Sequence, residues 1–181
     1  MPERQQQHAH LESLGDATQF AGQMHALIPK CPLLENFSQP EVELLAQFMA
    51  MYRAQPGAEI IREGEGGDFM LMLLEGRIDV HKRDRWNSPQ VLASVEAGRT
   101  LGEMSMIDGA PRFATCIAAE PSLIAVLDRE SLARIIVEQP LLGAKILMEL
   151  VLMLSHRLRA TSQRLLGLLD EQGQAGAHGV P

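Results

Sequence analysis

One segment of the chain, residues 102–115, combines side chains that suit a sugar phosphate. Arg112 carries a planar guanidinium whose N–H groups match the oxygens of a phosphate. Glu103 offers a carboxylate that accepts a hydrogen bond from a ribose hydroxyl. Gly102 allows a ligand to approach the backbone closely, and the turn at Gly109 brings Arg112 back toward Glu103. The pattern therefore predicts a sugar-phosphate site.

Residues 103–108 lie between these side chains and suit one or two helical turns. The N-terminus of such a turn has free backbone N–H groups, which attract anions. Taken alone, a Gly-Glu pair and a Pro-Arg pair are also typical of an ordinary turn that carries a surface cation. The elements around the segment must therefore decide between these interpretations.

Short strands are expected on both sides of this segment. Residues 69–74 are continuously apolar, whereas residues 77–82 alternate, which indicates one buried and one solvated face. Several short strands at regular spacing predict a mainly β domain, either a barrel or a sandwich. The remaining predicted strands are residues 60–61, 90–95, 115–118 and 123–127.

Helices are expected to flank the strands. Apolar residues recur at helical spacing over residues 20–27 until Pro29 ends the pattern. Ser38 and Glu41 have the spacing of a capping box before a second helix. Asp128 is a predicted N-cap for a helix over residues 129–139.

The last helix carries an apolar seam at coiled-coil spacing. A helix of about 29 residues is ~43 Å long, whereas a barrel of ~110 residues is only ~35 Å across. Part of the seam therefore extends beyond its own barrel, and we expect a parallel homodimer through this helix. The seam steps by four and three residues through Leu147, Val151, Leu154, Leu158, Thr161, Leu165 and Leu168.

The chain is thus expected to have four parts. Residues 1–18 form a flexible leader, and residues 19–139 form the β domain with its flanking helices. Residues 140–170 form the dimerisation helix, and residues 171–181 form a disordered tail rich in Gly and Ala.

The composition argues against several functions. Sixteen Lys and Arg against 23 Asp and Glu give a net charge of −7, which disfavours DNA binding. No apolar stretch is long enough to span a membrane, and two cysteines cannot form a disulfide framework, so we expect a cytoplasmic protein. Scattered histidines give no metal-ligand pattern, and no nucleophile has a recognisable activating neighbour, so we expect neither a metal site nor catalytic residues.

Residues 102–115 resemble the phosphate-binding cassette of the cyclic nucleotide-binding domain family. This family includes catabolite-activator-type regulators, kinase regulatory subunits and gated channels. Residues 62–68 and 74–76 also match the family's early strands and glycine turns, and the resemblance covers about residues 26–170. It implies an antiparallel β-roll of jelly-roll type plus a long C-terminal dimerisation helix. It also implies a cyclic nucleotide ligand, cAMP ahead of cGMP, and no cofactor.

The resemblance also implies roles for individual residues. Glu103 resembles the carboxylate that receives the ribose 2′-hydroxyl, and Arg112 resembles the arginine that pairs with the cyclic phosphate. Thr161 and Ser162 resemble a pair that contacts the purine, with the Ser reaching across the dimer, and Arg157 is placed to hold the phosphate or Glu103. The implied ligand-binding residues are Gly102, Glu103, Met104, Arg112, Phe113, Ala114, Val80, Ala93, Arg157, Thr161 and Ser162.

Two residues depart from the family pattern. Phe113 stands where the family usually has Ala, Ser or Thr, so its ring either stacks on the base or blocks the pocket. Leu101 replaces the usual aromatic residue before Gly-Glu, which we interpret as a packing difference.

Activator-type relatives continue after the dimer helix into a DNA-binding domain, but only 11 residues follow Asp170. We therefore expect a stand-alone sensor that signals through its homodimer to an unidentified effector protein. Two alternatives remain open at this point. One is a ligand-free structural dimer with a degenerate pocket, and the other is a cupin-like metal enzyme.

Overall fold

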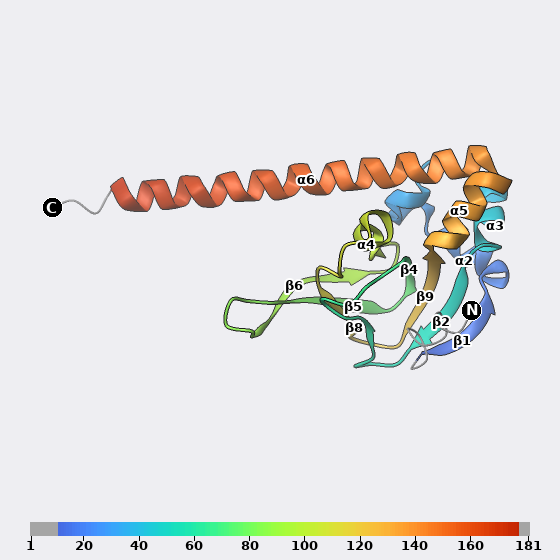
Figure 1. The fold of residues 1–181 in the computed structure, drawn as a ribbon, viewed down its shortest axis with the longest axis horizontal. Helices are drawn as coiled ribbons and strands as arrows, with labels where there is room; N and C mark the ends of the chain where they lie inside the picture. The colour runs from blue at the N-terminus through green and yellow to red at the C-terminus, as the bar shows by residue number, and fades with distance from the viewer. Residues whose placement is uncertain (1–10, 178–181) are drawn as a thin grey trace.

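The computed structural model describes residues 11–177, which form two antiparallel sheets with helices on one side (Figure 1). The strands are β1 Glu12–Asp16, β2 Ala50–Ala54, β3 Glu59–Ile61, β4 Phe69–Glu75, β5 Arg77–Arg83, β6 Pro89–Glu96, β7 Thr100–Leu101, β8 Thr115–Ala118 and β9 Ser122–Asp128. The helices are α2 Ala21–Ala26, α3 Gln39–Ala46, α4 Glu103–Asp108, α5 Arg129–Glu138 and α6 Pro140–Ala177, with short 3₁₀ turns at Thr18–Phe20, Ile28–Lys30 and Pro32–Leu34.

The two sheets form the β-roll that was expected. One sheet has the strand order β1-β2-β9-β4-β7, and the other has the order β3-β8-β5-β6. All pairings are antiparallel. The predicted strands at 60–61, 69–74, 77–82, 90–95, 115–118 and 123–127 are confirmed with small shifts at their ends.

Strand β4 is buried on both faces, which explains its unbroken apolar sequence. Phe69 and Leu71 belong to the cluster between the two sheets, whereas Met70 and Met72 belong to the cluster under the helices. Successive strand residues point to opposite faces, so one strand supplies both cores.

The predicted helix caps are confirmed. Ser38 and Glu41 form a reciprocal capping box at the start of α3. The Asp128 carboxylate accepts a hydrogen bond of 2.6 Å from the Ser131 backbone N–H and so caps α5.

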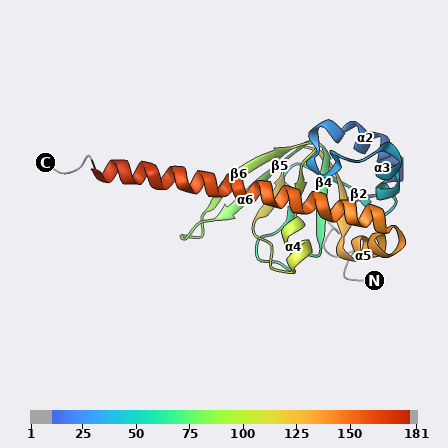
Figure 2. The ribbon, with the colours of Figure 1, turned by 90° about the horizontal axis from the view of Figure 1, so that it is seen from above.

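The first half of α6 is attached to its own domain, while its second half extends well past the β-roll (Figure 1). Lys145 donates hydrogen bonds to Glu41 at 2.8 Å, and buried Glu149 accepts one from Asn36 at 2.6 Å. Seen from above, α6 crosses over α4 (Figure 2). No helix within residues 11–177 is long and apolar enough to cross a membrane.

The predicted flexible leader is too long. Residues 12–16 form the edge strand β1, which pairs with β2, and buried Leu11 and Ala17 fix its two ends. The strand was missed because its polar, mostly exposed residues give no alternating pattern. Residues 1–10 lie outside the described part.

The predicted disordered tail also begins too early, because α6 continues through residues 171–177. The Gly and Ala residues of this segment had predicted an irregular chain. A helix that already exists is extended without a new nucleation cost, and the Glu, Gln and Ala residues here are good helix formers. Residues 178–181 lie outside the described part.

Candidate functional site

Helix α4 is held in place at both ends. It begins after Gly102, whose φ of +84° suits glycine because it lies in the left-handed region. At the other end, Arg129 of α5 donates hydrogen bonds to the carbonyls of Met106 at 2.7 Å and Ser105 at 2.9 Å. The segment that precedes Arg112 is therefore fixed to the rest of the domain.

Arg112 is a buried cation with spare hydrogen-bonding capacity. Its side chain is 4% exposed, and its guanidinium lies 4.1 Å from the centroid of the Phe69 ring. Nη1 donates to the Gly102 carbonyl at 2.8 Å, but Nη2 is buried with no partner among the described residues. Burial lowers the pKa of Arg112 from its ordinary value. A buried N–H without an acceptor is costly, so this guanidinium is suited to receive an anion.

Two glycines make room for the Arg112 side chain. A Cβ at Gly67 would overlap the guanidinium, and a Cβ at Gly102 would lie 2.7 Å from Arg112 Nη1. The close packing of Arg112 therefore depends on glycine at both positions.

Backbone hydrogen bonds fix the loop that carries Arg112. Its N–H donates to the Glu65 carbonyl at 2.8 Å, and its carbonyl accepts from the Gly64 N–H at 2.9 Å. Further along, the Thr115 hydroxyl accepts from the Glu63 N–H at 3.0 Å. These bonds join two loops that lie far apart in the sequence, and they leave Ala114 buried beside Arg112.

Glu103 is a buried carboxylate with one free oxygen. It is 1% exposed, and its Oε1 pairs with Nη1 of Arg157 from α6. Arg157 Nη2 also donates to the Thr100 carbonyl at 3.1 Å. In the described part of the chain, Glu103 Oε2 and the Thr100 hydroxyl have no hydrogen-bond partner. The site thus offers an acceptor for a ligand hydroxyl near a cation for a ligand anion.

The predicted site residues fall into two groups. Gly102, Glu103, Arg112 and Ala114 form the largely buried centre described above, and Arg157, whose side chain is 47% exposed, reaches Glu103 from α6. The others are half-buried or exposed, and no described side-chain bond joins them to Glu103 or Arg112: Val80 and Ala93, which pair across β5 and β6, Met104, Phe113, Thr161 and Ser162. The Thr161 hydroxyl donates to the Arg157 carbonyl at 2.9 Å, so it is occupied within its own helix.

Several residues that shape the site were not predicted from the sequence. Phe69 and Arg129 lie far from residues 102–115 along the chain, and nothing in their local sequence signals a contact with the cassette. The glycine pair at 66–67 was a usable signal, because paired glycines are typical of a close backbone approach.

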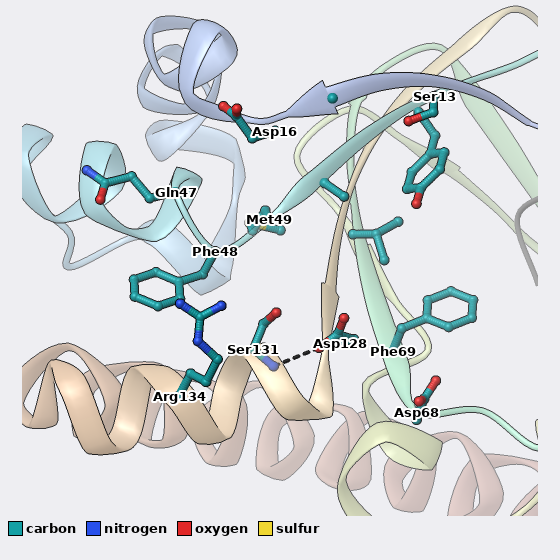
Figure 3. A pocket seen from close by; sticks show the side chains of 14 residues that line it. Ser13, Asp16, Gln47, Phe48, Met49, Asp68, Phe69, Asp128, Ser131 and Arg134 are labelled. Carbon is teal, nitrogen blue, oxygen red and sulfur yellow. Dashed lines mark hydrogen bonds between the residues drawn. The ribbon is translucent and has the colours of Figure 1, made fainter. Parts of the chain in front are cut away.

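A separate pocket of about 390 Å³ lies at one end of the β-roll (Figure 3). It contains none of the predicted site residues, although its wall includes Phe69, on which Arg112 stacks. The charged side chains that line it are Asp16, Asp68, Asp128 and Arg134, and Arg134 lies over Phe48. Three carboxylates against one guanidinium repel an anion, so this pocket is not the sugar-phosphate site.

The fold and the site define a class of protein: a β-roll with a short helical cassette whose buried guanidinium and carboxylate suit a sugar phosphate. Comparison with known proteins identifies the family. The profile of the cyclic nucleotide-binding domain matches residues 52–139. The crystal structure of a cyclic nucleotide-binding domain from Methylobacillus flagellatus KT is 37% identical, with a TM-score of 0.78 over 87% of this chain and 88% of that chain. This chain belongs to the cyclic nucleotide-binding domain family.

Relatives with wider architectures match over shorter stretches. The cAMP-dependent protein kinase regulatory subunit of Blastocladiella emersonii is 28% identical over 106 residues, which are 59% of this chain and 26% of that protein. The catabolite activator protein of Thermus thermophilus is 25% identical, with a TM-score of 0.70 over 76% of this chain and 62% of that chain. The chain therefore spans only about a quarter of the kinase subunit that it matches.

Proposed function

We propose that this protein is a cyclic nucleotide sensor whose preferred ligand is cAMP, with cGMP as the second choice. The observation that carries the proposal is the buried guanidinium of Arg112. It has no carboxylate partner among the described residues, and one of its nitrogens has no acceptor. A cyclic phosphate supplies both the missing charge and the missing acceptor.

The ligand fits the site in one orientation. Its phosphate accepts from Arg112 Nη2 and from the backbone N–H groups of Phe113 and Ala114. Its ribose 2′-hydroxyl donates to Oε2 of Glu103, which is free because Arg157 occupies the other oxygen. Placing the phosphate on Glu103 instead would set two negative groups together, so the two ends of the ligand are distinguished by charge.

The exposed seam of α6 supports a homodimer. Leu147, Val151, Leu158 and Leu165 are exposed in the single chain, and Leu154 is half-buried. The Leu168 side chain lies outside the described set. These residues repeat at coiled-coil spacing along the face of α6 that its own domain does not cover.

The heptad register supports a site shared between two chains. With the leucine seam at positions a and d, Arg157 falls at a g position and Ser162 falls at the e position of the following heptad. In a parallel coiled coil, a g residue lies beside an e residue of the partner helix. Ser162 of the partner subunit thus lies near the Arg157 that holds Glu103, so each ligand contacts both chains.

We further propose that the ligand sets the position of α6 and that the dimer passes this change to an effector protein. Arg157 connects the site to the helix at the point where α6 leaves the domain. A ligand can shift the helix only by its different affinities for the two arrangements. The interaction with Glu103 and Arg112 supplies that difference.

Isothermal titration with cAMP and cGMP tests the proposal. We expect binding by the wild type and at least a tenfold loss in Arg112→Lys, which keeps the charge but loses the guanidinium fork. Arg62→Lys is the matched control, because Arg62 is exposed and already pairs with Glu59 and Glu65. No heat with either nucleotide would favour a ligand-free structural dimer, and equal affinities in both variants would remove Arg112 from the site.

A further inference from the structure

Phe113 is an exposed aromatic residue directly beside the buried cation. Its side chain is 58% exposed, whereas the preceding Arg112 is 4% exposed. The two successive side chains therefore leave the backbone in different directions, one into the domain and one to its surface. Arg112 Nη2 is buried without a hydrogen-bond partner in the described part of the chain, while the Phe113 ring lies at the surface.

Lys82 of β5 holds Phe113 in this position. Its ammonium lies 4.5 Å from the centroid of the Phe113 ring and donates to the Phe113 carbonyl at 2.7 Å. A cation over the face of an aromatic ring is attracted to it. The same ammonium thus fixes both the backbone and the ring of one residue.

Glu63 fixes Lys82 in turn. Its Oε1 accepts from Lys82 Nζ at 2.7 Å, and its Oε2 accepts from the Arg83 N–H at 3.1 Å. Lys82 holds the pKa of Glu63 below its ordinary value, so the pair remains charged. The Glu63 N–H donates to the Thr115 hydroxyl, which connects this small network to the strand that follows the cassette. Lys82, which contacts the ring, is thereby fixed by Glu63, and Glu63 is connected to β8 through Thr115.

The geometry points to Phe113 as the residue that receives the base. We propose that the purine of the bound nucleotide stacks on the ring of Phe113, and that Lys82 and Glu63 are positioning residues for that ring. This inference rests on the proposed function. Phe113 follows Arg112 directly, and its backbone N–H is one of the groups proposed to bind the phosphate, so its ring extends from the edge of the proposed phosphate site. The base of a compact cyclic nucleotide is within reach of such a ring.

Stacking on an aromatic ring has a consequence for specificity. Every nucleobase has a π-face, so a stacking platform discriminates weakly among bases. We therefore expect the affinities for cAMP and cGMP to differ by less than about tenfold. A site that combines an anion-binding group with a stacking ring selects a sugar phosphate that carries a nucleobase, but it does not select one particular purine.

Titration with cAMP and with ribose 3′,5′-cyclic phosphate, which has no base, tests the proposal. Phe113→Ser should weaken cAMP binding roughly 5- to 150-fold, which corresponds to the loss of one base–aromatic stack, and leave the base-free ligand unchanged. Phe113→Tyr should keep the wild-type affinity for cAMP. Lys82→Met should weaken cAMP less than Phe113→Ser does, again without changing the base-free ligand.

Other results would overturn the proposal. Unchanged or tighter cAMP binding in Phe113→Ser would show that the ring does not hold the base. Equal loss of both ligands would place Phe113 or Lys82 at the phosphate. Dissociation of the dimer in Phe113→Ser, with cAMP affinity retained, would assign the ring to a contact with the partner subunit. If the wild type binds neither ligand, the proposed function itself has failed, which this design distinguishes from a failure of the stacking role.

Discussion

The two halves of α6 have the same apolar character but different surroundings. In the first half, Ile146, Leu150 and Met153 are buried against the chain's own domain. The seam residues Leu147 and Val151 of this half are exposed, and beyond Arg157 no described apolar residue of α6 is buried. The first half therefore has one apolar face packed on its own domain, whereas the second half has no such packing among the described residues. In the proposed dimer, the partner helix covers the exposed seam of both halves.

The boundary between these halves coincides with the ligand site. Arg157 pairs with Glu103 and donates to the Thr100 carbonyl, and it is the last residue of α6 with a described side-chain bond to the domain. Under the proposed function, a ligand on Glu103 acts on the residue where the attached half ends, and so on the position of the long helix.

The largest expected effect comes from the second half. Leu158→Asp should convert the dimer to monomers, weakening association by about 3–6 kcal/mol because each dimer loses two buried leucines. Sedimentation over a range of concentrations measures this change. The β-roll should unfold at an unchanged temperature when monomers are compared, since Leu158 is 69% exposed in the single chain. A dimer that persists in Leu158→Asp would refute the coiled-coil interface.

In the first half, we expect the opposite pattern. Leu150→Ala should lower the free energy of unfolding by about 2–5 kcal/mol, because Leu150 is 1% exposed and its loss leaves a cavity. Leu158→Ala is the matched control and should change the stability of the monomer by less than about 0.5 kcal/mol. Urea unfolding at low protein concentration measures both. Equal losses in the two variants would show that the halves of α6 do not differ.

The boundary residue should have an intermediate effect. Arg157→Gln should cost about 1–3 kcal/mol, because it leaves the buried Glu103 carboxylate without its cation. Adding Glu103→Gln to this variant should recover part of the loss, since the second change removes the uncompensated charge. A double-mutant cycle by urea unfolding gives the coupling energy, and a value of zero would contradict the connection between site and helix.

The fold was predicted correctly from the sequence wherever a pattern of neighbouring residues is enough to determine the element. The apolar run of β4, the capping box of α3 and the N-cap of α5 depend on neighbours in sequence. Strand β1 was not predicted because it is an edge strand. It is held by backbone hydrogen bonds to β2, and these do not require any particular side-chain pattern. The continuation of α6 past residue 170 was missed for a related reason, namely that helix propagation depends on the preceding turns.

For the site, the sequence predicted which residues lie close together. It did not predict which of their atoms are left without a hydrogen-bond partner. Glu103, Arg112 and Arg157 were named from spacing and resemblance, and the structure brings them together. The unpartnered atoms Arg112 Nη2 and Glu103 Oε2 follow from packing across several elements. The stacking of Arg112 on Phe69 likewise depends on residues distant in the sequence.

The smallest expected effect concerns the attachment of the first half through Glu41. Lys145 and the capping Ser38 lower the pKa of Glu41 from its ordinary 4.5 to about 2. Because the folded-state pKa is depressed, this carboxylate stabilises the fold above pH 4.5, and the contribution is lost as the pH falls toward 2. The side chain is one third exposed, so the contribution is about 1 kcal/mol at most.

Unfolding curves of the wild type and Glu41→Gln between pH 6 and pH 2 measure this contribution. Their difference in stability should shrink as the pH falls, because protonation removes the same charge that the substitution removes. Curves that stay parallel over this range would contradict the assigned pKa of Glu41.

The most direct test of the account is a crystal structure of the protein grown with cAMP. We expect the cyclic phosphate within hydrogen-bond distance of Arg112 Nη2, and the ribose 2′-hydroxyl on Oε2 of Glu103. A nucleotide found instead in the acidic pocket of Figure 3, or Arg112 and Glu103 left without a ligand at saturating cAMP, would contradict the central claim.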